Sequence, residues 1–111
     1  KMVAQSVNIQ IDKGTDFSRN FEMKNPDQSV LNLTGYSAVA KIRKFPEATK
    51  QHSFTVGITS ATGIIGLSMT VGVTTQLTNG RNFYDIIITS GVGTVTKAFE
   101  GSVIVNPSAS V

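Results

Sequence analysis

Leu77-Thr-Asn-Gly-Arg-Asn-Phe-Tyr-Asp-Ile-Ile-Ile-Thr-Ser90 is the stretch that decides the fold class of this chain. A glycine-bearing turn leads into a strand rich in aromatic and β-branched residues, which are the residue types that fit a pleated sheet. The turn Ser90-Gly-Val-Gly93 follows, and a second strand pattern runs from Thr94 to Val105. Together these segments predict the closing hairpin of an antiparallel β-sandwich.

Outside the hairpin, five further stretches alternate apolar and polar residues with the period of two that marks a half-buried strand. They are Val7–Ile11, Phe17–Met23, Tyr36–Ile42, Phe54–Ile58 and Ile65–Met69. With the hairpin they make about seven short strands, so we predict an all-β fold, an immunoglobulin-like antiparallel β-sandwich. In that topology the third and sixth strands lie side by side in one sheet. The expected core residues are Phe17, Phe21, Tyr36, Ile42, Phe54, Leu67, Ile86, Phe99 and Val103.

The length of 111 residues predicts a single domain over residues 1-111, with 106-111 as a linker or tail. Residues 44–51 read as a loop, and a single helical turn is one option for residues 70–77. The chain has no cysteine, so neither a disulfide nor a thiolate metal site can form. No apolar run approaches the roughly 20 residues that span a bilayer, so no membrane contact is expected.

The sequence shows no catalytic constellation. The only histidine, His52, is expected in an exposed loop with no neighbouring group to orient it, and a general base needs such a partner. Asp12-Lys-Gly-Thr-Asp16 lacks the dense acidic spacing of a calcium loop. Gly63-Ile-Ile-Gly66 and Ser90-Gly-Val-Gly93 are each followed by a strand rather than the helix that a phosphate cradle requires. We therefore expect no enzymatic activity, no cofactor and no metal.

The net charge is +3, and positive residues are concentrated at Lys41, Arg43, Lys44 and Lys50, with His52 beside them. Such a strip could bind a polyanion, because neutralised phosphates release counterions. The alternative is the solvated face of one strand and its loop. No exposed aromatic residue interleaves with these side chains, as stacking on nucleic-acid bases would require. The second interpretation is favoured, and no nucleic acid is expected as a partner.

The segment before the sixth strand has the spacing of a tyrosine corner, in which a phenolic hydroxyl bonds back to the preceding backbone. Leu77-Thr-Asn-Gly80 is followed by Phe83, which has no hydroxyl. Either Tyr84 takes the role or the corner is absent.

Several short motifs succeed one another along nearly the whole chain. They are Ile9-Gln-Ile-Asp-Lys-Gly-Thr-Asp-Phe17, Leu33-Thr-Gly-Tyr36 with Ala40-Lys-Ile-Arg43, Gly63-Ile-Ile-Gly-Leu-Ser-Met69, Gly80 with Tyr84-Asp-Ile86, and Phe99-Glu-Gly-Ser-Val-Ile-Val105. Their order and spacing resemble those of small bacteriophage tail and baseplate structural domains, similar to the N-terminal module of upper baseplate proteins. The chain departs from that pattern at Val71-Gly-Val-Thr-Thr75, where the family tends to carry an alanine-rich helical turn.

The resemblance implies a non-catalytic structural protein of the phage virion. Its role would be tail or baseplate assembly or attachment, by protein–protein docking to other virion structural proteins or to copies of itself as a homo-oligomer. The alternative is an immunoglobulin-like adhesion or carbohydrate-binding module on a cell surface or fibre. A sugar site needs exposed aromatic residues, and the chain has no tryptophan and only two tyrosines.

The alternation also predicts which residues face outward on the third, sixth and seventh strands. These strands are neighbours in an immunoglobulin-like order, so their outer face would carry an apolar patch with a charged rim, an arrangement typical of protein contacts. Alternatively, the chain's own loops cover Phe83 and Ile87. The expected interface residues are Val39, Lys41, Phe83, Asp85, Ile87, Ala98 and Glu100.

Overall fold

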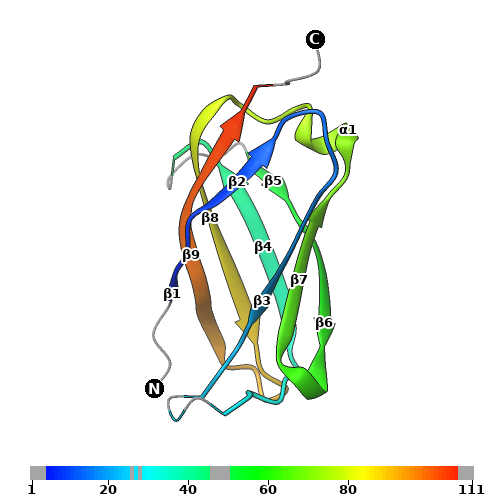
Figure 1. The fold of residues 1–111 in the computed structure, drawn as a ribbon. Coiled ribbons are helices and arrows are strands. Elements are labelled where there is room, and N and C mark those ends of the chain that lie inside the picture. Colours follow the sequence, from blue (N-terminus) through cyan, green and yellow to red (C-terminus); the bar gives the residue numbers. More distant parts are fainter. Residues whose placement is uncertain (1–4, 26, 28, 46–50, 108–111) are drawn as a thin grey trace.

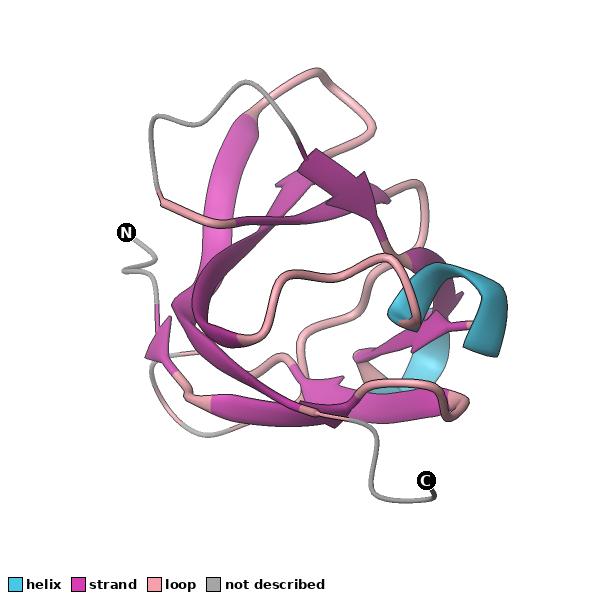
Figure 2. Ribbon diagram, turned by 90° about the horizontal axis from the view of Figure 1, so that it is seen from above, coloured by secondary structure: helices cyan, strands magenta, loops and turns pink. Residues whose placement is uncertain are grey.

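The computed structural model describes residues 5–25, 27, 29–45 and 51–107. These residues are mostly in strands, with one 3-10 turn at Ser60–Thr62 and one helical turn, α1 (Val71–Thr74). Two sheets face each other across one hydrophobic core (Figures 1 and 2), which confirms the predicted all-β class. The single helical turn between the fifth and sixth expected strands is also confirmed. The expected loop residues 46–50, including Lys50, and residues 108–111 of the expected tail lie outside the described residues.

The larger sheet has six strands and contains the hairpin that the sequence predicted. Its strands are β1 (Gln5–Ser6), β2 (Ile9–Asp12), β4 (Ser37–Arg43), β5 (Gln51–Ser53), β8 (Gly80–Thr89) and β9 (Val95–Asn106). They follow the order β1-β9-β8-β4-β5, and β2 pairs with β9 beside β1. The expected pairing of the third and sixth strands is confirmed, because β4 lies antiparallel against β8.

The prediction that the pairing is antiparallel throughout is wrong at one edge of this sheet. Both β1 and β2 run parallel to β9. A tight hairpin joins two strands that pair in the antiparallel sense, so it fixes the direction only of strands that follow each other within one sheet. After β2 the chain crosses to the other sheet, so β2 is free to pair with the last strand in the parallel sense.

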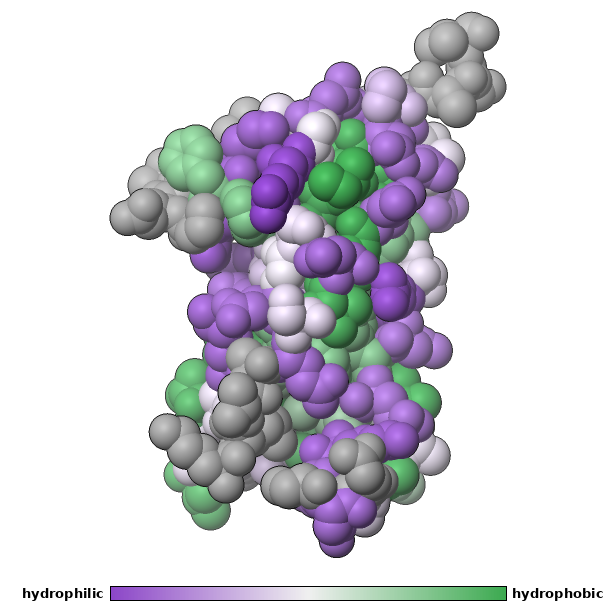
Figure 3. Space-filling model, turned by 60° about the vertical axis from the view of Figure 1, so that its left-hand side comes forward, coloured by the Kyte–Doolittle hydropathy of each residue, from purple (hydrophilic) through white to green (hydrophobic). Residues whose placement is uncertain are grey.

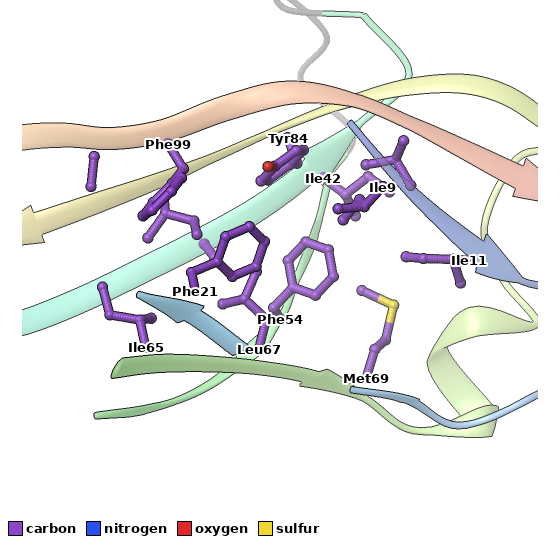
Figure 4. Packing of buried hydrophobic residues seen from close by; sticks show 14 of the residues in the cluster. Ile9, Ile11, Phe21, Ile42, Phe54, Ile65, Leu67, Met69, Tyr84 and Phe99 are labelled. Carbon is purple, nitrogen blue, oxygen red and sulfur yellow. The ribbon is translucent and has the colours of Figure 1, made fainter. Parts of the chain in front are cut away.

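The smaller sheet has three antiparallel strands in the order β3-β7-β6. They are β3 (Phe17–Glu22), β7 (Ile64–Met69) and β6 (Thr55–Thr59). Aromatic side chains join the two sheets: the rings of Phe21 and Phe99 lie 4.9 Å apart between their centroids (Figure 4). Of the expected core residues, Phe17 and Tyr36 are only partly buried and pack against the cluster from its border, while the others are buried.

The expected fourth strand corresponds to β6, and an additional strand, β5, precedes it. The assignment of Gln51 to the loop 44–51 is therefore wrong. β5 pairs with β4 in the larger sheet, whereas β6 pairs with β7 in the smaller one. Phe54 stands between them, buried, and its backbone N–H donates to the Ala40 carbonyl at 2.9 Å. The alternation of side chains continues through the crossing, so the sequence pattern by itself does not mark the change of sheet.

Candidate functional site

The strands β4, β8 and β9 are adjacent, and their outer residues form three rows across the sheet. Ile87 lies opposite Val39 on one side and Lys97 on the other. The next row is centred on Asp85, which lies opposite both Lys41 and Glu100. The third row is centred on Phe83. We call the surface formed by Val39, Lys41, Arg43, Phe83, Asp85, Ile87, Lys97 and Glu100 the outer face.

One residue expected on the outer face is buried instead. The register between β8 and β9 shifts at Ile86/Ile87: Ile86 pairs with Phe99, whereas Ile87 pairs with Lys97. Ala98 is the extra residue of this β-bulge, and it is only 1% exposed. A bulge reverses the alternation of facing along the strand. The assignment of Ala98 to the interface is therefore wrong, and Lys97 stands on the outer face in its place.

The other expected interface residues lie on the outer face with different exposures. Val39 is 53% exposed, and Glu100 is also exposed. Lys41, Phe83, Asp85 and Ile87 are half-buried. Figure 3, in which the left-hand side of Figure 1 comes forward, shows a surface of mixed character, with a narrow hydrophobic strip in the upper half of the view bordered by hydrophilic residues.

A pocket of about 300 Å³ opens on this side of the sheet. Its lining includes five charged side chains, the ring of Phe83, and polar residues of β1 and the segment that follows it. The charged residues are Arg43, Arg81, Asp85, Lys97 and Glu100. Sequence reasoning missed Arg81, although it stands two positions before Phe83 and the alternation along β8 places both on one face.

The two acidic residues of the pocket already have cationic neighbours. Arg43 Nη1 lies 3.8 Å from Asp85 Oδ2, and Lys97 Nζ lies 3.3 Å from Glu100 Oε1. The Arg81 guanidinium carbon stands 5.3 Å from the centroid of the Phe83 ring, within the range of a cation–π contact. Because each carboxylate already lies near a cation, the remaining cationic side chain, Arg81, gives the pocket a net positive charge.

The Arg43 side chain has one donor without an acceptor. Its Nη2 donates to Gln51 Oε1 at 2.7 Å. Its Nε is buried and has no hydrogen-bond partner among the described residues. A buried donor left unpaired costs about 1–3 kcal/mol, and more when the group is charged. Because the surrounding atoms cover this Nε, an acceptor from outside reaches it only if the Arg43 side chain shifts.

The segment between β1 and β2 closes one side of the pocket and is fixed by specific contacts. The Tyr84 hydroxyl donates to the Val7 carbonyl at 2.7 Å, and Asn8 Oδ1 accepts from the Ser102 N–H at 3.1 Å. Gly101 lies directly beneath, where any Cβ would collide with the Val7 carbonyl. Burial raises the pKa of Tyr84 to about 12, opposed by the positive charge of Arg19.

The bond from Tyr84 answers the question of the tyrosine corner. Its acceptor belongs to the first strand region, 77 residues away, and not to the turn before β8. A tyrosine corner in the usual sense is therefore not made by Tyr84, and the hydroxyl instead fixes the N-terminal edge strand.

The remaining candidate groups do not come together. His52 lies in β5 opposite Ile42 and is half-buried, so its expected position in an exposed loop is wrong. Asp12 and Asp16 are engaged with Asn106 and with the Val71 N–H. Within the described residues, no three His, Cys, Asp or Glu side chains are grouped so as to hold a metal ion. No helix in the described ranges is long and apolar enough to cross a membrane.

The basic strip is dispersed over different surroundings. Lys41 and Arg43 belong to the outer face, whereas Lys44 Nζ donates to the Asn79 carbonyl at 3.2 Å.

No protein-family model matches this chain, and no curated protein is significantly similar to it.

Proposed function

We propose that this chain is a structural protein of a bacteriophage virion, a tail or baseplate assembly module that acts by docking to other subunits. The order of its motifs supports this role. A second copy of the chain is the docking partner that experiments on the purified protein can address.

The observation that carries the proposal is the composition of the outer face. Val39 and Ile87 are opposite each other on adjacent strands and present apolar surface. Lys41, Asp85 and Glu100 form a charged row beside them. A small apolar centre bordered by charges is typical of surfaces that bind other proteins. The position of these residues on three long paired strands gives the surface a rigid support.

We further propose that the two sheets form an immunoglobulin-like sandwich. In that fold the second, fourth and fifth strands share one sheet, while the third, sixth and seventh share the other. Here β3, β6 and β7 correspond to the second, fourth and fifth expected strands and form the smaller sheet. β4, β8 and β9 correspond to the third, sixth and seventh expected strands and are adjacent in the larger sheet. The parallel strands β1 and β2 then occupy the edge beside the last strand.

A carbohydrate-binding role has less support. A sugar ring stacks on an exposed aromatic face. Of the two aromatic residues that line the pocket, Tyr84 is buried in the core, which leaves Phe83. Its ring is half-buried and is covered by the Arg81 guanidinium. The polar residues of the pocket are suited to a charged group rather than to a sugar ring.

Two experiments test the proposal. Genes for tail, baseplate or capsid proteins next to the coding sequence are expected, and neighbours of another functional class would contradict the virion role. Light scattering on Ile87→Glu and Val39→Lys tests the docking face. We expect both variants to lose self-association, and an oligomer unchanged by both substitutions would remove this face as the interface.

A further inference from the structure

The pocket on the outer face contains more cationic than anionic groups. Three of its lining residues, Arg43, Arg81 and Lys97, are positive, and two, Asp85 and Glu100, are negative. Each negative residue lies within 4.0 Å of a cation of the same pocket. Arg81 has no ion-pair partner among the described residues. A ligand that complements this pocket therefore carries negative charge.

The arginines present donors of a particular geometry. Arg43 Nε is buried and has no acceptor among the described residues, although both terminal nitrogens of the same guanidinium have neighbours. Arg81 lies over the Phe83 ring, which leaves the edge of its planar group for hydrogen bonds. Planar guanidinium groups match the two oxygens of a carboxylate. The Phe83 ring adds apolar surface at the same place, suited to the methylenes of an acidic side chain.

We propose that this pocket binds a carboxylate side chain, a glutamate or aspartate within an otherwise apolar segment of the docking partner. The assignment rests on the proposed docking function of the outer face and specifies the chemistry of its partner. The carboxylate accepts hydrogen bonds from the exposed Arg81 and, after a shift of the Arg43 side chain that uncovers its Nε, from Arg43. Flanking apolar side chains lie toward Val39 and Ile87. The pocket would thereby fix the register of the partner on the sheet.

The chain provides an internal reference for the test, because it has three arginines and Arg19 lies on β3 in the other sheet. Arginine side chains labelled with ¹⁵N give separate Nε–H resonances. The probe is the peptide acetyl-Leu-Glu-Leu-amide, and acetyl-Leu-Gln-Leu-amide is its uncharged match. We expect the glutamate peptide to shift the resonances of Arg43 and Arg81, with a dissociation constant on the order of 1 mM. The Arg19 resonance should stay in place.

The matched variants are Arg43→Lys and Arg19→Lys, which make the same change inside and outside the pocket. Lysine keeps the charge but loses the Nε donor and the planar fork. Arg43→Lys should weaken peptide binding about tenfold, the effect of losing a hydrogen bond to a charged group. Arg19→Lys should leave it unchanged. Unaltered backbone amide spectra in both variants establish that the fold is kept.

Several results would overturn the assignment: no shift at Arg43 and Arg81, an equal shift with the glutamine peptide, or equal binding by Arg43→Lys. Inorganic phosphate is titrated in parallel, and binding tighter than that of the peptide would also overturn it. The outcome is separable from the docking proposal. If the peptide does not bind but Ile87→Glu still abolishes assembly, only the carboxylate site is refuted. If the peptide binds as expected but Ile87→Glu leaves assembly unchanged, only the docking face is refuted.

Discussion

Strands β4, β8 and β9 have an inner face and an outer face, and the side chains on the two faces have different surroundings. On the inner face of β8, Tyr84, Ile86 and Ile88 are buried in the core. On the outer face, Phe83, Asp85 and Ile87 are half-buried beside charged side chains. Successive residues of one strand thus have different surroundings, because side chains alternate between the faces. The inner residues stabilise the fold, and the outer residues are the ones that we propose to contact a partner.

The largest effect is expected from truncation of an inner aromatic residue. Phe99→Ala removes a ring that contacts Phe21 in the centre of the core, and should lower the free energy of unfolding by about 3–5 kcal/mol. Phe83→Ala on the outer face is the control and should cost about 1 kcal/mol. Urea denaturation measures both. Equal losses in the two variants would show that the faces do not differ in this way.

An intermediate effect is expected at Gly101. In Gly101→Ala the new methyl group collides with the Val7 carbonyl and displaces the segment between β1 and β2. We expect a loss of about 1–3 kcal/mol, as for other overpacked sites. Gly57→Ala is the matched control, since a Cβ there meets nothing within 4 Å in strand β6. A Gly101→Ala domain as stable as Gly57→Ala would mean that this edge strand is loosely held.

A smaller effect is expected from the hydroxyl of Tyr84. Tyr84→Phe removes the hydrogen bond to Val7 and should cost about 1 kcal/mol. The raised pKa of Tyr84 adds a dependence on pH. The unfolded chain releases this proton near pH 10 and the folded chain near pH 12, so folding stability contributed by Tyr84 is complete below pH 10 and declines as the pH rises through 12.

Thermal melts at pH 8 to 12 measure this decline. The lysines also titrate in that range, so the informative quantity is the difference between wild type and Tyr84→Phe. The melting temperature of the wild type should fall more steeply above pH 10 than that of the variant. Parallel curves would indicate that the hydroxyl ionises as easily in the folded state as in the unfolded state.

The sequence predicted the strands well because alternation is a local property of the chain. Ile42 and Ile86 were expected in the core from period alone, and both are buried. The bulge at Ala98 was not predictable in this way, because one extra residue in β9 is defined only by its register against β8. The parallel pairing of β2 with β9 joins segments more than 90 residues apart. Local patterns carry no information on such a pairing.

The candidate site was predicted in part for the same reason. Phe83, Asp85 and Ile87 were assigned to the outer face by alternation along one strand, and the structure places them there. Lys97 was missed because the bulge reverses the facing of the residues on one side of it. The unpaired Nε of Arg43 depends on the positions of side chains from several strands. The sequence alone offers no means of finding it.

Light scattering on Ile87→Glu tests most directly the claim that the outer face mediates association. Val71→Glu is the matched control, because Val71 is 47% exposed on α1, away from the outer face. We expect the wild type and Val71→Glu to show the same concentration-dependent rise in mass, and Ile87→Glu to remain a monomer with unchanged stability. A monomeric wild type, or an oligomer that persists in Ile87→Glu, would contradict self-association through this face.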